Sequence, residues 1–165
     1  KVEQIEATML RAKQYAISQY QGVADYVQSL GLEKPIHIGE TGWSSVAASL
    51  YGASGSKAAD ELKLGLYYQH MRDWEKESGM SVFYFEAFDE QWKDPNDVNG
   101  SENHFGLIGL DNKVKFPLWD LIDQQAFQGL KRGGKPLGKS YDGDWNSLLK
   151  DAELPPLNKS TNLAD

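Results

Sequence analysis

The chain has 165 residues, and its 17 Lys and Arg residues against 24 Asp and Glu residues give a formal net charge of −7 at pH 7. This charge argues against binding to nucleic acid phosphates, which requires clustered cations, and against binding to an anionic membrane surface. No apolar run approaches the roughly 20 residues that a membrane-spanning helix needs. The absence of Cys excludes disulfides, thiolate metal ligands and a cysteine nucleophile.

The first expected element is a helix over residues 3–30. Gly22 weakens its middle, so two shorter helices are an alternative. Gly31 is suited to end it, and Pro35 lies in the loop that follows. The apolar residues of this segment recur every three or four positions, as on one face of a helix, and they are Ile5, Met9, Ala12, Ala16, Tyr20, Val23, Val27 and Leu30.

A short strand is expected over residues 36–39, where β-branched residues precede a Gly. A second helix follows over residues 57–78, with Ser56 as its N-cap and Gly79 as its end. The strongest strand signal covers residues 81–85, which are rich in β-branched and aromatic side chains.

Residues 87–112 form a long polar segment, and loops of this length in compact domains are usually functional. A third helix is expected from Pro117 to about residue 128, because proline suits the first helical position. We divide the chain into residues 1–130 and an irregular extension over residues 131–165, with one short helix near residues 144–151.

The expected order is helix, strand, helix, strand, helix, with continuously apolar strands. This alternation is typical of the α/β class, in which a parallel sheet is buried on both faces. Two strands are too few for a complete sheet, and a (β/α)₈ barrel uses about 250 residues, or about 30 for each strand–helix unit. The chain therefore has the size of about two such units and a preceding helix.

Carboxylates follow both expected strands. Glu40 comes directly after the first strand, and Glu86 and Glu90 come after the second. Because the carboxyl ends of parallel strands meet at one edge of a sheet, we expect these groups to lie near each other. Trp43 and Trp92 follow closely, and carboxylates beside flat aromatic rings suit the cleavage of glycosidic bonds.

Structural explanations compete with this interpretation. Glu40 could form a buried ion pair that holds its loop, and Glu90 could simply pair with Lys93 three residues later. His37, His70 and His104 lack the spacing of metal ligands, so we expect them to be structural or surface residues and expect no metal site. The sequence contains no nucleotide-binding or serine-nucleophile motif, and we expect no cofactor.

Two segments resemble signatures of glycoside hydrolase family 17, the β-1,3-glucanases and β-1,3-glucan transglycosylases. Residues 35–45 (PIHIGETGWSS) are similar to its nucleophile segment, and residues 83–93 (FYFEAFDEQWK) are similar to its eighth-strand signature, especially in the bacterial branch. Residues 102–107 and 115–119 fit the closing stretch of the same barrel. The resemblance covers about residues 15–130, and the two main motifs have the family's order and spacing.

The resemblance implies that Glu40 is the nucleophile of a retaining mechanism at the end of barrel strand seven. It places Glu90 and Lys93 beside the nucleophile, where they bind sugar hydroxyls and tune its charge. It further implies substrate-binding roles for Glu86 and, as sugar platforms, for Trp43, Phe85 and Trp92. One departure is Ser44-Ser45, where the family usually has Pro-Ser.

A larger departure is an absence. The family's acid/base Glu belongs to strand four, and nothing in this chain corresponds to strands one to six. We therefore expect an α/β chain that forms part of a (β/α)₈ barrel, with strands seven and eight and their flanking helices. The expected partners are a β-1,3-glucan and the N-terminal part of the barrel or a swapped copy.

The start of the chain lacks an initiator Met and a signal-peptide core, so we expect a trimmed or mature chain. The family resemblance implies an extracellular or periplasmic enzyme. Two alternatives remain. One is a non-catalytic or vestigial carbohydrate-binding module, and the other is a related retaining β-glycanase or transglycosylase, which the Phe88-Asp89-Glu90-x-x-Lys93 segment disfavours.

Overall fold

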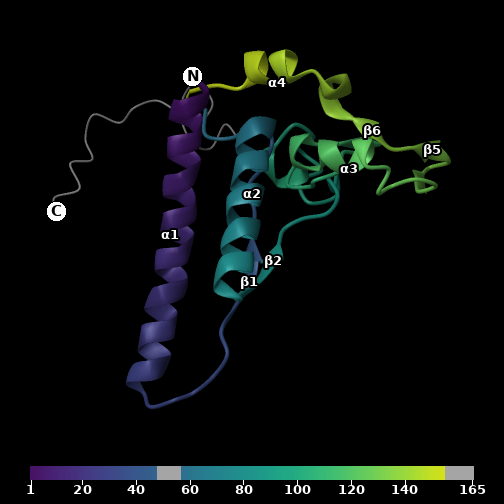
Figure 1. Ribbon diagram of the computed structural model, residues 1–165. Helices are drawn as coiled ribbons and strands as arrows, with labels where there is room; N and C mark the ends of the chain where they lie inside the picture. Colours follow the sequence, from purple (N-terminus) through teal and green to yellow (C-terminus); the bar gives the residue numbers. More distant parts are fainter. Residues whose placement is uncertain (48–56, 155–165) are drawn as a thin grey trace.

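A computed structural model of the protein describes residues 1–47 and 57–154. The long helix α1 (Val2–Ser29) lies beside α2 (Glu61–Ser78), and the parallel strands β1 (His37–Thr41) and β2 (Ser81–Tyr84) lie against α2 (Figure 1). The mixed helix and strand composition agrees with the expected α/β class. Among the described residues, no helix combines the length and apolarity needed to cross a bilayer.

Helix α1 is continuous through Gly22, so the alternative of two shorter helices is wrong. Only the first part of its apolar stripe is buried, at Ile5 and Met9, because α2 is the shorter helix and lies against that part. Beyond the contact of Tyr20 with α2, the stripe is exposed at Val23 and Leu30. Figure 1 shows this end of α1 projecting past the rest of the molecule.

Helix α2 begins later than expected. Its N-cap is Asp60, whose carboxylate accepts a hydrogen bond from the Lys63 N–H at 3.0 Å, as N-cap side chains do. The expected cap, Ser56, lies outside the described residues. The end of the helix is confirmed, because Gly79 adopts the left-handed conformation with φ 70° that favours glycine.

Strand β1 begins and ends later in the chain than the expected strand over residues 36–39. It covers His37–Thr41, so Glu40 lies inside the strand, and β2 ends one residue earlier than expected, at Tyr84. Between the paired positions Ile38↔Val82 and Thr41↔Tyr84, β1 has one residue more than β2. This irregularity has the form of a β-bulge, which re-aims the side chains near it.

The expectation of a sheet buried on both faces is wrong for the described residues. Helix α2 covers one face, where the Thr41 and Tyr67 hydroxyls lie 2.7 Å apart and the Tyr68 and Tyr84 rings meet edge to face. Side chains alternate along a strand, so Phe83 is on the other face, and 62% of it is exposed. Glu40 precedes Thr41 and is also exposed.

The third helix is shorter than expected. A 3₁₀ turn, η3 (Phe116–Leu118), leads into α3 (Trp119–Asp123), and the chain then turns at Gln125, which has a positive φ of 57°. The prediction that this helix extends to about residue 128 is therefore wrong.

The chain after residue 130 contains regular structure. Strands β4 (Lys131–Arg132) and β5 (Lys135–Pro136) form an antiparallel hairpin, and β6 (Gly138–Lys139) pairs in parallel with β3 (Lys113–Val114). The 3₁₀ helix η4 (Ser140–Gly143) then leads to α4 (Trp145–Asp151), which confirms the short helix expected near residues 144–151.

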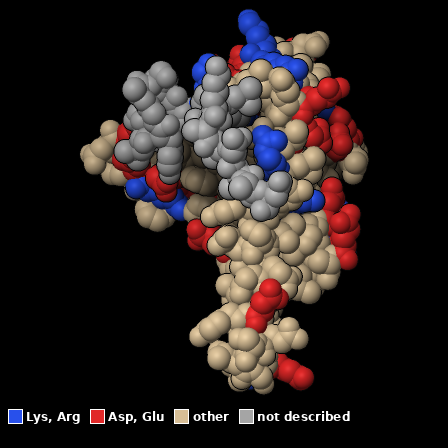
Figure 2. All heavy atoms as spheres, turned by 90° about the vertical axis from the view of Figure 1, so that its left-hand side faces the viewer, with Lys and Arg blue, Asp and Glu red and all other residues tan. Residues whose placement is uncertain are grey.

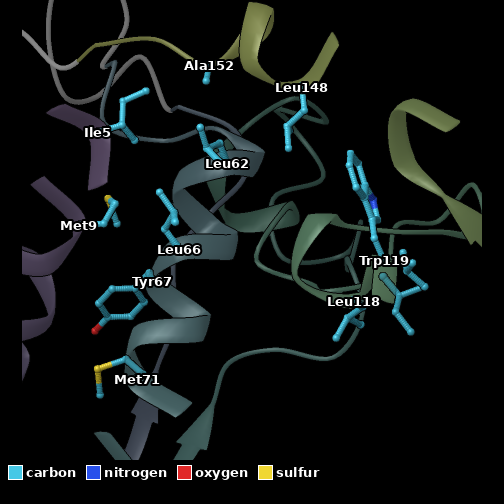
Figure 3. Packing of buried hydrophobic residues seen from close by; sticks show 12 residues of the cluster. Ile5, Met9, Leu62, Leu66, Tyr67, Met71, Leu118, Trp119, Leu148 and Ala152 are labelled. Atoms are coloured by element: carbon cyan, nitrogen blue, oxygen red, sulfur yellow. The ribbon is translucent and has the colours of Figure 1, made fainter. Parts of the chain in front are cut away.

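The core lies between α1, α2 and the later helices (Figure 3). Ile5 and Met9 of α1 face the buried side of α2, and α4 adds Leu148 from the end of the chain. Fully burying one such side chain stabilises a fold by about 1.5–3 kcal/mol. The other members of the cluster are Leu62, Leu66, Tyr67, Met71, Ile108, Val114, Leu118, Trp119 and Ala152.

Candidate active site

The ends of β1 and β2 hold Glu40 and Glu86 at the same end of the sheet. The Phe85 N–H donates to the Thr41 carbonyl at 2.7 Å, which continues the ladder past β2. At Gly42, an added Cβ would lie 1.8 Å from the Phe85 carbonyl oxygen, so only glycine permits this approach. The two glutamates are thus fixed relative to each other by tight backbone contacts.

Glu86, Glu90 and Lys93 form a cluster, which we name the carboxylate–lysine cluster. The Lys93 ammonium lies 3.7 Å from Glu86 Oε2 and 3.5 Å from Glu90 Oε2. It also lies 3.7 Å from the centre of the Phe85 ring, within the range of a cation–π contact. The expected local pairing of Glu90 with Lys93 is present, and the same ammonium also pairs with Glu86.

Glu86 is in an unusual environment. Its side chain is only 14% exposed, and its Oε1 atom is buried without a hydrogen-bond partner among the described residues. Burial raises the pKa of Glu86 to about 7, Lys93 opposes this shift, and the charge of Glu90 adds to it. The carboxyl group therefore binds a proton in the neutral range instead of ionising fully.

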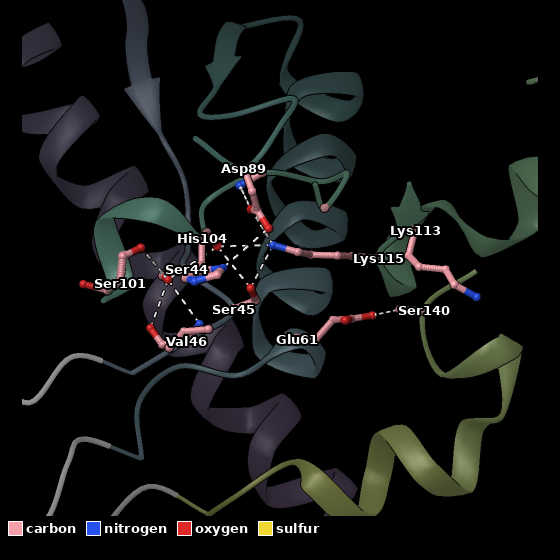
Figure 4. A network of polar contacts seen from close by, with 12 residues as sticks. Ser44, Ser45, Val46, Glu61, Asp89, Ser101, His104, Lys113, Lys115 and Ser140 are labelled. Atoms are coloured by element: carbon pink, nitrogen blue, oxygen red, sulfur yellow. Dashed lines mark hydrogen bonds and ion pairs between the residues drawn. The ribbon is translucent and has the colours of Figure 1, made fainter. Parts of the chain in front are cut away.

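Asp89, on the same loop as the cluster, belongs to a second, buried group of charges that includes Lys115 from a separate segment (Figure 4). Its Oδ1 atom accepts from the Lys115 ammonium at 2.8 Å and from the Gly106 N–H at 2.9 Å, and its Oδ2 atom lies 3.5 Å from His104 Nδ1. Burial alone raises the pKa of Asp89, but the hydrogen bonds and charges of His104 and Lys115 outweigh burial and lower it. Asp89 therefore stays ionised and anchors the loop.

The buried charges connect the loops that follow the two strands. Lys115 donates to Ser45 Oγ at 2.8 Å, and the Ser45 N–H donates to the His104 carbonyl at 2.9 Å. Ser44 is buried, donates to the Ser101 carbonyl at 2.9 Å and accepts from the Val46 N–H at 3.2 Å. A proline at position 44 would offer neither hydroxyl contact, so the departure from the family pattern has a structural role here.

Asn103, within the 3₁₀ helix η2 (Ser101–Asn103), organises the loop after the carboxylate–lysine cluster. Its fully buried amide donates to the Asp94 and Asp97 carbonyls and accepts from the Asp94 N–H, at distances of 2.8–3.0 Å. The Glu90 N–H donates to the Asn103 carbonyl at 3.3 Å. Buried amides satisfied in this way fix a loop that would otherwise be mobile.

The three predicted aromatic platforms differ in accessibility. Trp43 lies against Tyr67, with ring centres 5.2 Å apart, and its indole N–H donates to the Ala58 carbonyl. Phe85 has Lys93 over its ring and Phe105 at its edge. Trp92 is 71% exposed, so it offers the largest free aromatic surface of the three.

The structure thus brings Glu86, Glu90, Lys93 and Phe85 into one cluster and places Trp43 against the core. Sequence analysis missed the buried charges and Asn103. Lys115 and Asp89 both lie in segments that resemble family signatures, but they are 26 residues apart and no local pattern indicates that they pair. The expectation that His104 is structural or on the surface agrees with its contact with Asp89.

This arrangement is that of an α/β protein with carboxylates and exposed aromatic rings at one end of a parallel sheet. No family model matches the chain. It is similar to the crystal structure of an endo-laminarinase from Formosa Hel1_33_131, with 54% sequence identity and a TM-score of 0.91 over 96% of this chain and 40% of that one. A β-1,3-glucanosyltransferase mutant from Rhizomucor miehei, solved with laminaritriose, has 29% identity and a TM-score of 0.50 over 65% of this chain and 35% of that one.

Curated relatives point in the same direction. A glucan 1,3-β-glucosidase of Arthroderma benhamiae is 39% identical over 113 residues, which are 64% of this chain and 32% of that protein. A glucan 1,3-β-glucosidase of Candida albicans is 35% identical over 85 residues, which are 49% of this chain and 25% of that protein. These similarities confirm the relationship to the β-1,3-glucanases of glycoside hydrolase family 17. The chain spans about a quarter to a third of the length of these curated relatives.

Proposed function

We propose that this chain is the C-terminal part of the catalytic (β/α)₈ barrel of a retaining β-1,3-glucanase, with β1 and β2 as barrel strands seven and eight. The observation that carries the proposal is the joint position of Glu40 and the carboxylate–lysine cluster at one sheet end. The high similarity to 40% of an endo-laminarinase chain supports it. In this proposal residues 1–130 belong to the barrel and residues 131–165 form an extension.

Glu40 is the proposed nucleophile. Its carboxylate attacks the anomeric carbon, the bond to the leaving oxygen breaks, and an acid on a part of the barrel outside this chain protonates that oxygen. Water then attacks the glycosyl–enzyme with the same acid residue acting as base, which releases the sugar and restores Glu40. The exposed position of Glu40 on the uncovered sheet face is consistent with access by a polysaccharide.

The carboxylate–lysine cluster is proposed to bind sugar hydroxyls beside the nucleophile. Lys93 supplies N–H donors, and Glu86 and Glu90 supply oxygen acceptors, with Glu86 also able to donate when it is protonated. Trp92 is the favoured aromatic platform because most of its side chain is exposed. Phe85 lies beneath the Lys93 ammonium and supports it. The proposal also includes Trp43 as a platform, with its ring face as the contact surface because its indole N–H already donates to the Ala58 carbonyl.

The remaining barrel is proposed to cover surfaces that are open in this chain. Phe83 on the sheet is exposed, and the projecting end of α1 exposes Val23, Tyr26 and Leu30. Figure 2 shows that the lower part of the molecule, seen from the side of α1, is mostly uncharged with a few acidic side chains. Faces of this kind are typical of surfaces that another part of a protein buries. For the complete enzyme we propose an extracellular or periplasmic location, where a polymeric glucan is accessible.

The proposal is tested by Glu40→Gln in the full-length protein. Loss of the nucleophile should reduce laminarin hydrolysis on the order of 10³-fold or more, while laminarin binding persists because the amide keeps the shape of the site. Glu33→Gln, in the exposed loop after α1, is the matched control and should retain full activity. Glu40→Gln turnover within tenfold of wild type would overturn the assignment, and binding without hydrolysis by the wild type would favour a non-catalytic module.

A further inference from the structure

Thr41 is the side-chain anchor of the short segment that carries Glu40. In the sequence Gly39-Glu40-Thr41-Gly42 the two glycines have no side chain to pack. The exposed Glu40 side chain makes no hydrogen bond or ion pair with any residue that the structure describes. Within this part of the chain, the Thr41 hydroxyl is therefore the side-chain group that ties the segment to its surroundings.

The β-bulge makes this anchor important. Between its paired positions, β1 has two residues, Gly39 and Glu40, where β2 has one, and regular pairing resumes at Thr41. The Thr41 carbonyl then accepts from the Phe85 N–H at 2.7 Å. A bulge interrupts the ladder and leaves its extra residue unpaired. The direction of the Glu40 side chain therefore depends on how firmly Thr41 is held.

Tyr67 of α2 holds Thr41 from the covered face of the sheet. The two hydroxyls lie 2.7 Å apart, which is the usual length of an O–H···O hydrogen bond. Only 4% of Tyr67 is exposed, and it lies on α2 among the core residues (Figure 3). The Trp43 ring packs against it with ring centres 5.2 Å apart. Because packing fixes the Tyr67 ring, its hydroxyl is a fixed point for the strand.

The hydroxyl contact is stable around neutral pH. Burial raises the pKa of Tyr67, and the hydrogen bond with Thr41 opposes part of this shift. The Tyr67 hydroxyl therefore stays protonated, and one of the two hydroxyls can always donate to the other.

We infer that Tyr67 is a positioning residue that fixes the Glu40 carboxylate through Thr41. Side chains alternate along a strand, so Thr41 faces α2 while Glu40 lies on the opposite, open face. Misplacement of a reacting group by about 1 Å can lower a rate about 10²-fold. The inference rests on the proposed function, in which Glu40 is the nucleophile, and it adds a residue of the covering helix to those that determine the rate.

The experiment measures laminarin hydrolysis and Tm in the full-length enzyme. Tyr67→Phe and Thr41→Val each remove one hydroxyl with little change of shape. We expect kcat to fall about tenfold with KM changed less than about twofold, because positioning of the nucleophile acts on the transition state. Thr41→Ser keeps the hydroxyl and should rescue kcat to within about threefold of wild type. Tyr68→Phe is the matched control, since the Tyr68 ring packs on Tyr84 instead, and it should match the wild type.

The double variant Tyr67→Phe/Thr41→Val separates positioning from stability. Each single variant leaves a buried hydroxyl without its partner and lowers Tm, whereas removal of both hydroxyls leaves none unpaired and should restore most of the Tm. We expect kcat of the double variant to stay as low as in the single variants, because both changes break the same contact. Recovery of kcat together with Tm would overturn the inference, because the hydroxyls would then contribute to stability alone.

Glu40→Gln distinguishes failure of the inference from failure of the proposed function. If Glu40→Gln is inactive and Tyr67→Phe keeps the wild-type kcat, the proposed function stands and the inference is overturned. A rise in KM without a fall in kcat for Tyr67→Phe also overturns it, because such a change indicates a role in binding. If Glu40→Gln retains wild-type turnover, Glu40 is not the nucleophile, and the proposed function and the inference both fail.

Discussion

The Glu86 carboxyl group shares a single cation with Glu90. Lys93 lies within 4 Å of an oxygen of each, at 3.7 and 3.5 Å, so the cluster of two carboxyls and one ammonium is neutral when one proton is bound. Burial is the main cause of the raised pKa of Glu86, to about 7, and the negative charge of Glu90 adds to it. The cluster therefore binds a proton in the neutral range, and under the proposed function the protonated carboxyl donates to a sugar oxygen.

The raised pKa of Glu86 predicts a specific pH dependence of stability. Between the ordinary pKa of 4.5 and the folded value of about 7, the folded protein binds more protons than the unfolded chain, so the free energy of unfolding falls as the pH rises. Glu86→Gln in the full-length protein removes this contribution. We expect the difference in Tm, variant minus wild type, to increase from pH 5 to pH 8. Glu33→Gln is the control, and a difference independent of pH would contradict the raised pKa.

Asp89 yields a second prediction at the scale of a residue. Asp89→Asn leaves the buried Lys115 ammonium without its charged partner, and breaking a buried pair in this way destabilises proteins by about 3–5 kcal/mol. We expect a loss of this size in the free energy of unfolding, measured by denaturant titration of the full-length protein. Asp120→Asn makes the same change at an exposed position and should alter stability little. A loss below about 1 kcal/mol for Asp89→Asn would show that the pair is not structurally important.

These two residues illustrate what the sequence could reveal about the site. Glu86 was identifiable because a carboxylate directly after an apolar strand is unusual and suggests a site. The role of Asp89 was not identifiable, because its partner Lys115 comes from a separate segment that only the folded loops bring near. Local patterns thus located the carboxylates but not the buried charges that hold them in place.

At the scale of elements, the sequence predicted those helices and helix ends that apolar periodicity and capping residues mark. The long helix α1, the end of α2 at Gly79 and the short helix α4 were identified from local signals. The third helix was overextended, because nothing local indicates that the chain reverses at Gln125. The bulge in β1 was also missed, since it depends on how β1 pairs with β2.

The contact between the ends of β1 and β2 gives a prediction with a matched control. Gly42→Ala places a methyl group 1.8 Å from the Phe85 carbonyl oxygen, so the two strand ends must separate. We expect a loss of stability of about 1–3 kcal/mol, and a fall in laminarin hydrolysis because Glu40 and Glu86 move apart. Gly39→Ala, where an added Cβ meets no atom within 4 Å, should retain both stability and activity. Equal behaviour of the two variants would mean that this contact does not position the site.

At the scale of the whole molecule, the chain has more open apolar surface than a self-sufficient domain needs. The sheet has two strands, one of its faces exposes Phe83, and the last turns of α1 expose Tyr26 and Leu30. Open strand edges and exposed apolar faces favour association with another chain. The endo-laminarinase of similar structure matches this chain over 40% of its own length, so most of that protein lies outside the match.

We therefore predict that residues 1–165 alone do not hydrolyse laminarin and that activity returns when the N-terminal part of the same gene product is co-expressed. Under the proposed function the chain supplies the nucleophile Glu40 but not the acid that protonates the leaving oxygen, and general acid catalysis contributes about 10²–10⁴-fold to the rate. Tyr26→Asp should weaken the reassembly, because it introduces a charge into the proposed interface on α1, whereas Glu3→Asp at the other end of the same helix should not. Sedimentation velocity and laminarin hydrolysis measure assembly and activity together. A monodisperse, active monomer of residues 1–165 would contradict the proposed incomplete barrel, because the exposed faces of β2 and α1 would then need no partner.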